Sequence, residues 1–395
     1  MSGPLSGVTV IDLTRVLSGP YCTMVLADLG ARVIKIEHPR RGDDTRHWGP
    51  PFIGTESAYF LSINRNKESL TLDFKPAAGK AVLERLLSIA DVLVENFRPG
   101  TLEAAGFGAR ALEERFPRLI YCSISGYGQT GPRRNEPGYD AVMQAEGGLM
   151  SITGDADGPP YRLGVAITDI VSGLFAAQGV LAALVARQRT SRGQQVDIGM
   201  LDATAALLTY QAANYFTTGE APARTGNRHP TIVPYESFET ASGDLVIAGG
   251  NDDIWRQLCR ALELDHLADD PRFRTNRDRA AHYAELRALL DRVLRTRSRD
   301  EWLTRLGAAG VPCGSVRAIS EVFADPQIAA RQMVAEVDHP TVGRAKVIGS
   351  PVKLSDTPAS VRTAPPVLGQ HTGAVLGELG YDRETIDGFR AAGVI

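Results

Sequence analysis

Val8-Thr9-Val10-Ile11-Asp12-Leu13 opens the segment that decides the fold class. This apolar run predicts a buried strand, and Leu17-Ser18-Gly19-Pro20 follows it as a turn. Residues 21–29 predict a helix that ends at Gly30, and residues 32–37 predict a second strand. Because strands joined through a helix pair in parallel by a right-handed crossover, the sequence predicts an α/β sheet.

The composition is that of an ordinary globular protein. The chain has 395 residues, of which 43% are hydrophobic and 23% charged, with a formal net charge of −3 at pH 7. This length allows two domains with separate cores, and the charge favours neither nucleic acid nor an anionic membrane as a partner. The N-terminus lacks a basic and apolar signal region, so we expect a cytoplasmic protein, or one of an organelle matrix.

The cysteines indicate neither a disulfide framework nor a metal site. Cys22, Cys122, Cys259 and Cys313 are widely spaced, and the sequence contains no Cys-x-x-Cys pair. No histidine stands at a metal-ligand spacing from them. We therefore expect reduced thiols of an intracellular protein and no bound metal.

Asp169 stands at the head of the most apolar long stretch, residues 161–187. Thr168 and Asp169 are both good helix-capping residues, and a cap is the simplest interpretation. Alternatively, the helix dipole and N–H donors keep Asp169 ionised in a dry setting, where a carboxylate acts as a covalent nucleophile. The two interpretations are compatible. The stretch nears the length of a membrane span, but Ser172 and Gln178 interrupt it, so we expect a core helix.

Two nucleotide motifs are weak or missing. Residues 126–131 match the Gly-x-Gly-x-x-Gly fingerprint and follow a predicted strand at residues 119–124. However, Pro132-Arg133-Arg134 follows in place of the helix whose N-terminus would bind a phosphate, so we expect no dinucleotide site there. The sequence also contains no Gly-Lys-Ser/Thr, and ATP hydrolysis is therefore not supported.

Basic residues recur where predicted strands run into loops. They occur in the loop at residues 38–51 and again at Arg65, Lys67, Lys75 and Arg98. Scattered surface charge explains any one of them. Loops at the carboxyl ends of parallel strands are where open α/β sheets bind ligands, so their recurrence favours a small polyanionic ligand such as a phosphorylated nucleotide.

Several spans, taken together, resemble the family III CoA-transferases. They cover nearly the whole chain in order and comprise Val10-Ile11-Asp12-Leu13 with Gly19-Pro20, Val33-Ile34-Lys35-Ile36-Glu37, Asn64-Arg65-Asn66-Lys67, Val94-Glu95-Asn96-Phe97-Arg98-Pro99-Gly100, Gly126-Tyr127-Gly128 with Gly131-Pro132, and Pro366-Val367-Leu368-Gly369-Gln370-His371-Thr372. The resemblance implies a doubly wound, mostly parallel Rossmann-like sheet in a large domain, a smaller α+β domain, and an interlocked homodimer.

A polar segment at residues 217–230 predicts the boundary between the two domains. We expect the first part of the large CoA-binding domain at residues 1–220 and the small domain at residues 225–328. A return segment at residues 329–395 then completes the large domain. Hairpins are predicted around residues 241–244 and 339–343.

The resemblance also implies roles for single residues. In the family a nucleophilic aspartate stands at the position of Asp169. The counterparts that contact CoA are Arg15, Leu17, Ser18, His38, Leu72, Asp73, Lys75, Asn96, Phe97, Arg98, Tyr139 and Asp140. Arg15 and His38 depart from the His and Arg that are frequent there. Because an unshifted imidazole is mostly uncharged at neutral pH, Arg40 or Arg41 is a substitute for His38 as a phosphate contact.

Three local sequence features distinguish between the branches of the family. Gly138-Tyr139-Asp140 replaces the Gly-His-Asp of the 2-methylacyl-CoA racemases, and tyrosine is a poor base. Only Ala248-Gly249-Gly250-Asn251 stands where the formyl/oxalate branch has a long glycine run. Residues 226–229, 232–235 and 339–343 look most like transferases that pass CoA from succinyl-CoA to another dicarboxylate. We therefore expect that activity, with a racemase or epimerase and a catalytically silent CoA-binding protein as alternatives.

The expected reaction needs an acyl-CoA and a carboxylate as substrates and no tightly bound cofactor. Asp169 would attack the donor thioester, giving an aspartyl anhydride and then an aspartyl-CoA thioester. Because both intermediates hydrolyse easily, water must be excluded, which suggests a lid.

Four further residues are candidates for the acyl pocket or its lid. Gly249 and Gly250 could form the lid and present N–H groups to an oxyanion, although a plain hairpin end is as good an interpretation. Trp48 could form a wall of the pocket, against ordinary core packing. Arg46 could hold the distal carboxylate of a dicarboxylate, against a plain surface arginine.

Overall fold

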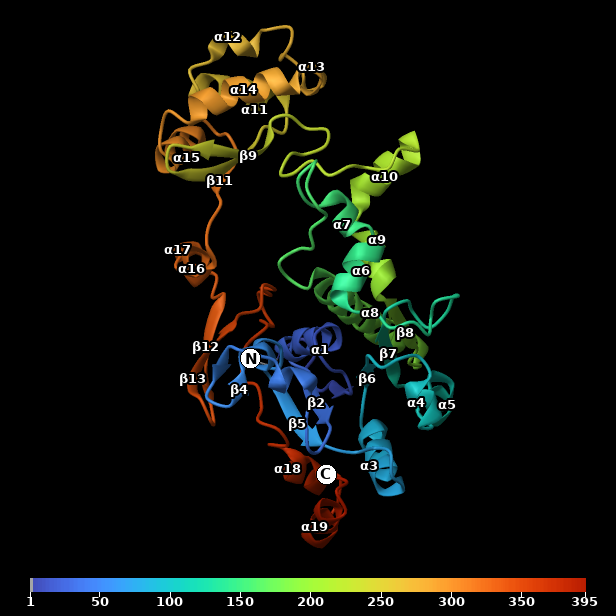
Figure 1. The fold of residues 1–395 in the computed structure, drawn as a ribbon. Coiled ribbons are helices and arrows are strands. Elements are labelled where there is room, and N and C mark those ends of the chain that lie inside the picture. Colours follow the sequence, from blue (N-terminus) through green and yellow to red (C-terminus); the bar gives the residue numbers. More distant parts are fainter. Residues whose placement is uncertain (1–2) are drawn as a thin grey trace. The chain divides into compact units, whose positions relative to one another are not determined.

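The computed structural model describes residues 3–395, which divide into two compact units (Figure 1). Unit 1 contains residues 3–149, Arg162–Phe216 and Pro326–Ile395. Unit 2 contains Met150–Tyr161 and Thr217–Asp325. The C-terminal segment thus belongs to the same unit as the N-terminal segment.

Unit 1 is built on a six-stranded sheet in the order β5-β2-β1-β6-β7-β8. All neighbouring strands pair in parallel. The strands are β1 (Thr9–Asp12), β2 (Arg32–Glu37), β5 (Lys67–Thr71), β6 (Val92–Glu95), β7 (Ile120–Ser125) and β8 (Gln195–Gly199). The chain order runs outward in opposite directions from β1 and β6. This pair is therefore the topological switch point, where open α/β sheets bind ligands.

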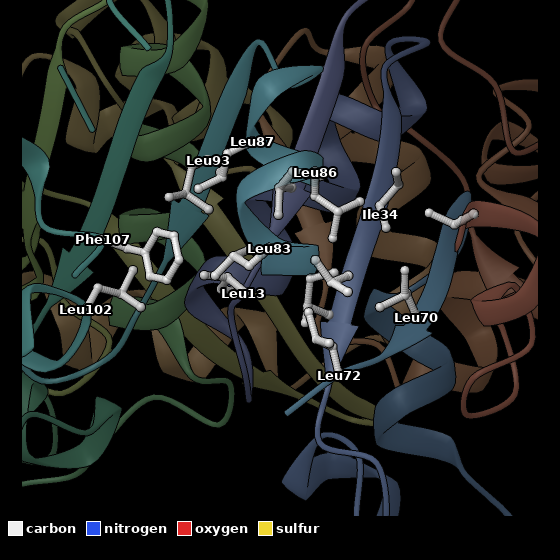
Figure 2. Close-up of a cluster of buried hydrophobic side chains, with 14 of the residues drawn as sticks. Leu13, Ile34, Leu70, Leu72, Leu83, Leu86, Leu87, Leu93, Leu102 and Phe107 are labelled. Carbon is white, nitrogen blue, oxygen red and sulfur yellow. The ribbon is translucent and has the colours of Figure 1, made fainter. Parts of the chain in front are cut away.

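Helices cover both faces of this sheet because successive strand residues point to opposite faces and both sets are apolar. Ile34 and Leu93 pack with leucines of the helices on one face, as Figure 2 shows, and Ile11 belongs to the same cluster. Val10, Val33 and their neighbours pack on the other face. The helices of the first face are α3 (Ala77–Ser88), α4 (Thr101–Ala104), α5 (Ala109–Arg115), α18 (Thr372–Glu378) and α19 (Arg383–Ala391). Those of the second face are α1 (Ser18–Asp28), α6 (Asp140–Glu146), α8 (Ile167–Thr190) and α9 (Met200–Ala206).

Helix α8 is the long apolar helix that the sequence predicts. It begins at Ile167 with Ala166 as its N-cap residue, and Asp169 lies in its first turn. The prediction that Thr168 or Asp169 caps this helix is therefore wrong. By length and apolar composition α8 could cross a membrane, a test that core helices of soluble proteins also pass. In unit 1 it packs against α1, α9, β7 and β8.

The C-terminal segment of unit 1 is tied to strand β5 by hydrogen bonds. Thr71 N–H donates to Thr372 Oγ1 at 3.0 Å, and His371 N–H donates to Ser69 O at 2.9 Å. The other elements of this unit are η1 (Asp44–His47), β3 (Phe52–Ile53), β4 (Glu56–Ser57), α2 (Ala58–Ile63), α17 (Pro326–Ala330), β12 (Val334–His339) and β13 (Gly343–Ile348). Helices α7 (Leu149–Ile152) and α10 (Thr209–Thr218) lie at the boundaries with unit 2.

Unit 2 has a three-stranded antiparallel sheet in the order β11-β10-β9. Phe238, Trp255 and Trp302 are among the buried residues of its own core. Its strands are β9 (Tyr235–Thr240), β10 (Gly243–Ala248) and β11 (Cys313–Ser315). Its helices are α11 (Asp252–Ala261), α12 (Asp265–Ala268), α13 (Asn276–Ala281), α14 (Tyr283–Leu294), α15 (Arg299–Ala308) and α16 (Ile319–Phe323).

The predicted α/β class and both predicted hairpins are confirmed. The parallel β1–β2 pair encloses α1, as the opening segment predicts. The hairpins are β9–β10 and β12–β13.

Candidate active site

The site lies at the switch point, where the loops after β1 and β6 are joined by hydrogen bonds. Arg15 N–H donates to Asn96 Oδ1 at 2.9 Å, and Asn96 Nδ2 donates back to Arg15 O at 2.7 Å. Phe97 N–H donates to the buried Glu95 carboxylate at 2.7 Å. Val16 follows with φ at +67°, a conformation that a β-branched residue rarely adopts. The surrounding contacts therefore hold this loop in a strained form.

Two cavities meet at Arg15 and Phe97, which line both. The larger is about 520 Å³, and its other lining residues include His38, Arg41, Leu72, Asp73, Lys75 and Lys80. The smaller is about 170 Å³, and its other lining residues include Ser18, Asn96, Arg98, Tyr139, Asp169 and Met200. The structure thus brings most of the predicted CoA contacts to two adjoining cavities, the smaller of which is lined by Asp169.

Leu17 and Asp140 are the predicted contacts that line neither cavity. Leu17 is buried in a small apolar cluster with Met24 and Ile63. Asp140 is engaged by α8, because Thr168 N–H and Thr168 Oγ1 donate to its carboxylate at 2.9 and 2.7 Å. Gln144 Nε2 donates to its second oxygen at 2.7 Å. Asp140 therefore caps the start of α8 from another helix, a role that the sequence did not indicate.

The Asp169 carboxyl is partly buried and lies near a second carboxylate, that of Asp140. Burial and the nearby Asp140 carboxylate raise the pKa of Asp169 to about 7, and a hydrogen bond from Ser18 opposes this shift. Burial and the Asp140 charge thus oppose the predicted effect of the helix donors and dipole, which favour the ionised form. A carboxylate that ionises near neutrality is more basic than an ordinary one, and hence a stronger nucleophile once charged.

Tyr59 and Trp48 form an aromatic pair near Asp169. Their ring centroids are 5.3 Å apart with the planes at 84°. Burial, and then the charge of Asp169, raise the pKa of Tyr59 to about 12, so its hydroxyl stays protonated. Trp48 is 41% exposed, which argues against the core-packing interpretation of this residue. The sequence did not single out Tyr59, since an isolated tyrosine in a short helix gives no signal.

Arg46 has a structural partner in place of a substrate. Its Nε and Nη2 donate to the two Glu37 carboxylate oxygens, each at 2.7 Å, and Nη2 also donates to Pro366 O. The guanidinium carbon lies 3.6 Å from the centroid of the Phe60 ring. Because this side chain is only 8% exposed, the structure argues against its proposed contact with a distal carboxylate.

Two of the basic residues that suggested a polyanion site also pair inside the protein. Lys67 bonds Asp12 at 3.1 Å, and Arg65 bonds Asp28 at 2.6 Å, all four side chains being buried. Burial favours the neutral acid, but Lys67, Lys35 and two threonine hydroxyls lower the pKa of Asp12 to about 2. The interpretation of Lys67 and Arg65 as ligand contacts is thus corrected, whereas Lys75 and Arg98 do line the cavities.

Neither glycine motif forms the binding site that its pattern suggests, as the elements and hydrogen bonds around each show. Strand β7 ends at Ser125, and no helix begins between Ser125 and Asp140, a stretch that the structure describes throughout. The fingerprint at residues 126–131 therefore lacks a helix N-terminus. In unit 2, Gly249 N–H donates to Pro234 O at 2.7 Å, and Gly250 N–H to Ala248 O at 3.0 Å. These bonds argue against the suggested role of both N–H groups as oxyanion donors.

Among residues 3–395 no group of three His, Cys, Asp or Glu side chains could hold a metal.

Comparisons with known proteins agree over most of the chain. The model of the family described as CoA-transferase family III matches residues 5–372. The chain is 45% identical to the succinyl-CoA:glutarate CoA-transferase of Mus musculus over 99% of its length and 90% of that protein. It is 42% identical to the succinate–glutarate CoA-transferase of Agrobacterium fabrum over 97% of its length and 96% of that protein. Among solved structures, a CAIB/BAIF family protein from Brucella suis has a TM-score of 0.85 at 41% identity, covering 96% of this chain and 100% of that one.

Proposed function

Because the chain belongs to CoA-transferase family III and is a CoA-transferase, we propose that it moves CoA from succinyl-CoA to another dicarboxylate, with glutarate the first candidate. The similar transferases of Mus musculus and Agrobacterium fabrum, which act on succinate and glutarate, support this choice of donor and acceptor. One observation carries the proposal: Asp169 lines a cavity that shares Arg15 and Phe97 with a larger cavity lined by several cations.

The nucleotide end of CoA fits the larger cavity. Arg41, Lys75 and Lys80 line it and can bind phosphate oxygens. Burial, and then the charge of Arg41, lower the pKa of His38, so the imidazole is neutral at pH 7 and Arg41 is the better phosphate contact. The pantetheine arm would pass over Arg15 and Phe97, which line both cavities, into the smaller one. Its thiol would then reach Asp169.

Asp169 carries the acyl group and then CoA in turn. Its carboxylate attacks the succinyl thioester, which releases CoA thiolate and leaves an aspartyl-succinyl anhydride. The thiolate attacks the aspartyl carbonyl, succinate leaves, and an aspartyl-CoA thioester remains. The acceptor carboxylate attacks that thioester, which releases the thiolate and leaves an aspartyl-acceptor anhydride. The thiolate then attacks the acceptor carbonyl, which forms the product thioester and frees the Asp169 carboxylate. Because one thioester replaces another, the exchange needs no ATP.

The aromatic pair of Trp48 and Tyr59 is suited to the acyl side of the site. The two rings give an apolar surface close to Asp169, which would limit the access of water to the anhydride. The Tyr59 hydroxyl stays protonated and can donate to a carboxylate or an oxyanion.

The rate is expected to depend on the ionisation of Asp169. Since burial and then Asp140 raise its pKa to about 7, kcat/KM should rise with pH and level off above that value. Below it, each pH unit should cost about a factor of ten. Asp140→Asn removes the repelling charge and keeps an oxygen that accepts from Thr168, so the midpoint of its profile should move to lower pH. A midpoint that stays in place would contradict the assigned effect of Asp140.

The activity itself is tested with the purified protein, succinyl-CoA and a panel of carboxylates that includes glutarate, itaconate, malate, citramalate and oxalate. Mass spectrometry of the CoA thioesters should show glutaryl-CoA appearing with an equal amount of free succinate. If no acceptor gains CoA while a 2-methylacyl-CoA takes up solvent deuterium, the protein is a racemase. If CoA binds and neither reaction occurs, the proposed activity is wrong.

Exposed apolar side chains support assembly with a second copy of the chain. In unit 1, helix α10 exposes Tyr210, Tyr215 and Phe216, the last being 80% exposed. Leu174 and Val185 of α8 are also exposed. Because water-exposed apolar surface of this extent usually marks an interface, the protein should have twice the mass of one chain in solution. A monomer at micromolar concentration would contradict this assembly.

A further inference from the structure

Ser18 is the first residue of α1. Burial and the Asp140 charge raise the pKa of Asp169, and hydrogen bonding from the Ser18 side chain opposes them. The residue is 4% exposed and lines the same small cavity as Asp169. Ser18 therefore lines the same cavity as the carboxyl that would form and break bonds in the proposed reaction.

The backbone around Ser18 is fixed by a close helix crossing. A Cβ added at Gly173 would stand 2.5 Å from Ser18 O and 3.2 Å from Cys22 N, so only glycine allows α1 and α8 to approach this far. Gly173 lies four residues after Asp169, and residues at this spacing share one face of a helix. The crossing thus places the start of α1 directly beside the first turn of α8.

The chain on the other side of Ser18 is fixed as well. Val16 has φ at +67°, and its N–H donates to the buried Asp43 carboxylate at 3.2 Å. A Cβ at Gly19 would clash with the Thr14 side chain at 2.3 Å, which shows how tightly this turn is packed. Ser18 therefore has little freedom to turn away from Asp169.

We infer that Ser18 is a second catalytic side chain, which holds the nucleophilic carboxylate and afterwards donates to the aspartyl carbonyl oxygen under attack by CoA. This inference rests on the proposed function. When the thiolate bonds to the Asp169 carbonyl carbon, the carbonyl electron pair moves onto the oxygen, where the Ser18 O–H stabilises it. The pair then re-forms the carbonyl as the acyl carboxylate leaves. Ser18 gives up no proton in this step.

The same contact favours the charged form of Asp169 before the reaction begins. Burial and the Asp140 charge both favour the protonated acid, and a donated hydrogen bond is the opposing influence at this carboxyl. A serine that only contacts CoA, which is the role implied by family resemblance, would not affect the ionisation of the free enzyme. The two roles therefore differ in a measurable property.

The test compares Ser18→Ala, Ser18→Thr and the control Ser172→Ala. Ser172 is buried in α8 and donates to Thr168 O at 2.6 Å, so its removal deletes a similar hydroxyl nearby. The pKa of Asp169 is read by NMR from protein labelled with ¹³C at the aspartate carboxyl, and Asp169→Asn identifies the signal. Ser18→Ala should raise this pKa, whereas Ser18→Thr and Ser172→Ala should leave it close to that of the parent.

Turnover and CoA binding complete the test. Ser18→Ala should lower kcat by about tenfold to hundredfold, as for loss of one oxyanion donor, with the Kd for CoA unchanged. An unchanged pKa of Asp169, or a weaker Kd for CoA with kcat retained, would overturn the inference. Because the NMR titration needs no turnover, it decides the role of Ser18 even if every carboxylate acceptor fails and the proposed function is wrong.

Discussion

Replacing Asp169 by alanine is expected to abolish CoA transfer and to leave CoA binding intact. The carboxylate is the group that would bond covalently to the acyl donor, and removal of a covalent nucleophile costs roughly 10⁴-fold or more in kcat. The nucleotide end of CoA lies in the other cavity in our proposal, so its affinity should change little. Thioester exchange by mass spectrometry and CoA binding by calorimetry measure the two properties separately.

Asp169→Asn is the matched control variant, because asparagine keeps the size and shape of the aspartate side chain but has no carboxylate. Because the pKa of Asp169 is raised above its usual value, the native state binds this proton more tightly than the unfolded state, and stability is lost as pH rises from about 4 through 7. Asp169→Asn removes this cost and should unfold no earlier than the parent at pH 8.

An intact-protein mass increase from covalently bound CoA should appear only in the parent. Turnover by either variant within tenfold of the parent would contradict the assignment of the nucleophile.

Replacing Lys67 by methionine is expected to destabilise unit 1 by about 3–5 kcal/mol, because it leaves a buried carboxylate without its cation. Lys67 Nζ donates to Asp12 Oδ2 at 3.1 Å, Pro20 O at 2.9 Å and Asn64 Oδ1 at 3.0 Å. The side chains of Lys67 and Asp12 are both 0% exposed. Denaturant unfolding, followed by intrinsic fluorescence or circular dichroism, measures the loss.

A surface pair provides the control. Arg110 and Glu114 lie 3.3 Å apart with side chains that are 94% and 68% exposed, and Arg110→Met should cost less than about 1 kcal/mol. The pKa of Asp12 is lowered to about 2 in the native protein, so the stability from its ionised form is present above about pH 4 and lost as pH falls further. The cost of Lys67→Met should therefore be larger at pH 7 than at pH 3. Equal losses for the two variants would contradict the role of the buried pair.

The sequence was most informative where a local pattern determines the structure. The alternation of strand and helix in residues 8–37 is periodic and bounded by Pro20 and Gly30, so the parallel pair and its helix could be predicted. The apolar stretch after Asp169 predicted α8 for the same reason. Both hairpins were marked by turn residues between apolar runs.

The remaining features depend on contacts between residues far apart in the chain. In the sequence, Lys67 resembles any charged residue near a loop. It lies next to Asp12 only because β5 pairs with β2, which in turn pairs with β1. Asp140 and Thr168 belong to different helices, so no spacing rule predicts that one caps the helix of the other. Resemblance to a family predicted which residues line the cavities. It could not show that Arg46 already forms an ion pair with Glu37.

The meeting of two cavities at Arg15 and Phe97 has a consequence for how this protein can change over evolutionary time. If nucleotide recognition and carboxyl chemistry occupy separate cavities, substitutions near Trp48 and Tyr59 can exchange one acid for another at no cost in affinity for the carrier. A change in the acid that the enzyme accepts would then require substitutions only at a few residues near Asp169, such as Trp48 and Tyr59. The carrier site, and the scaffold beneath it, would be inherited intact.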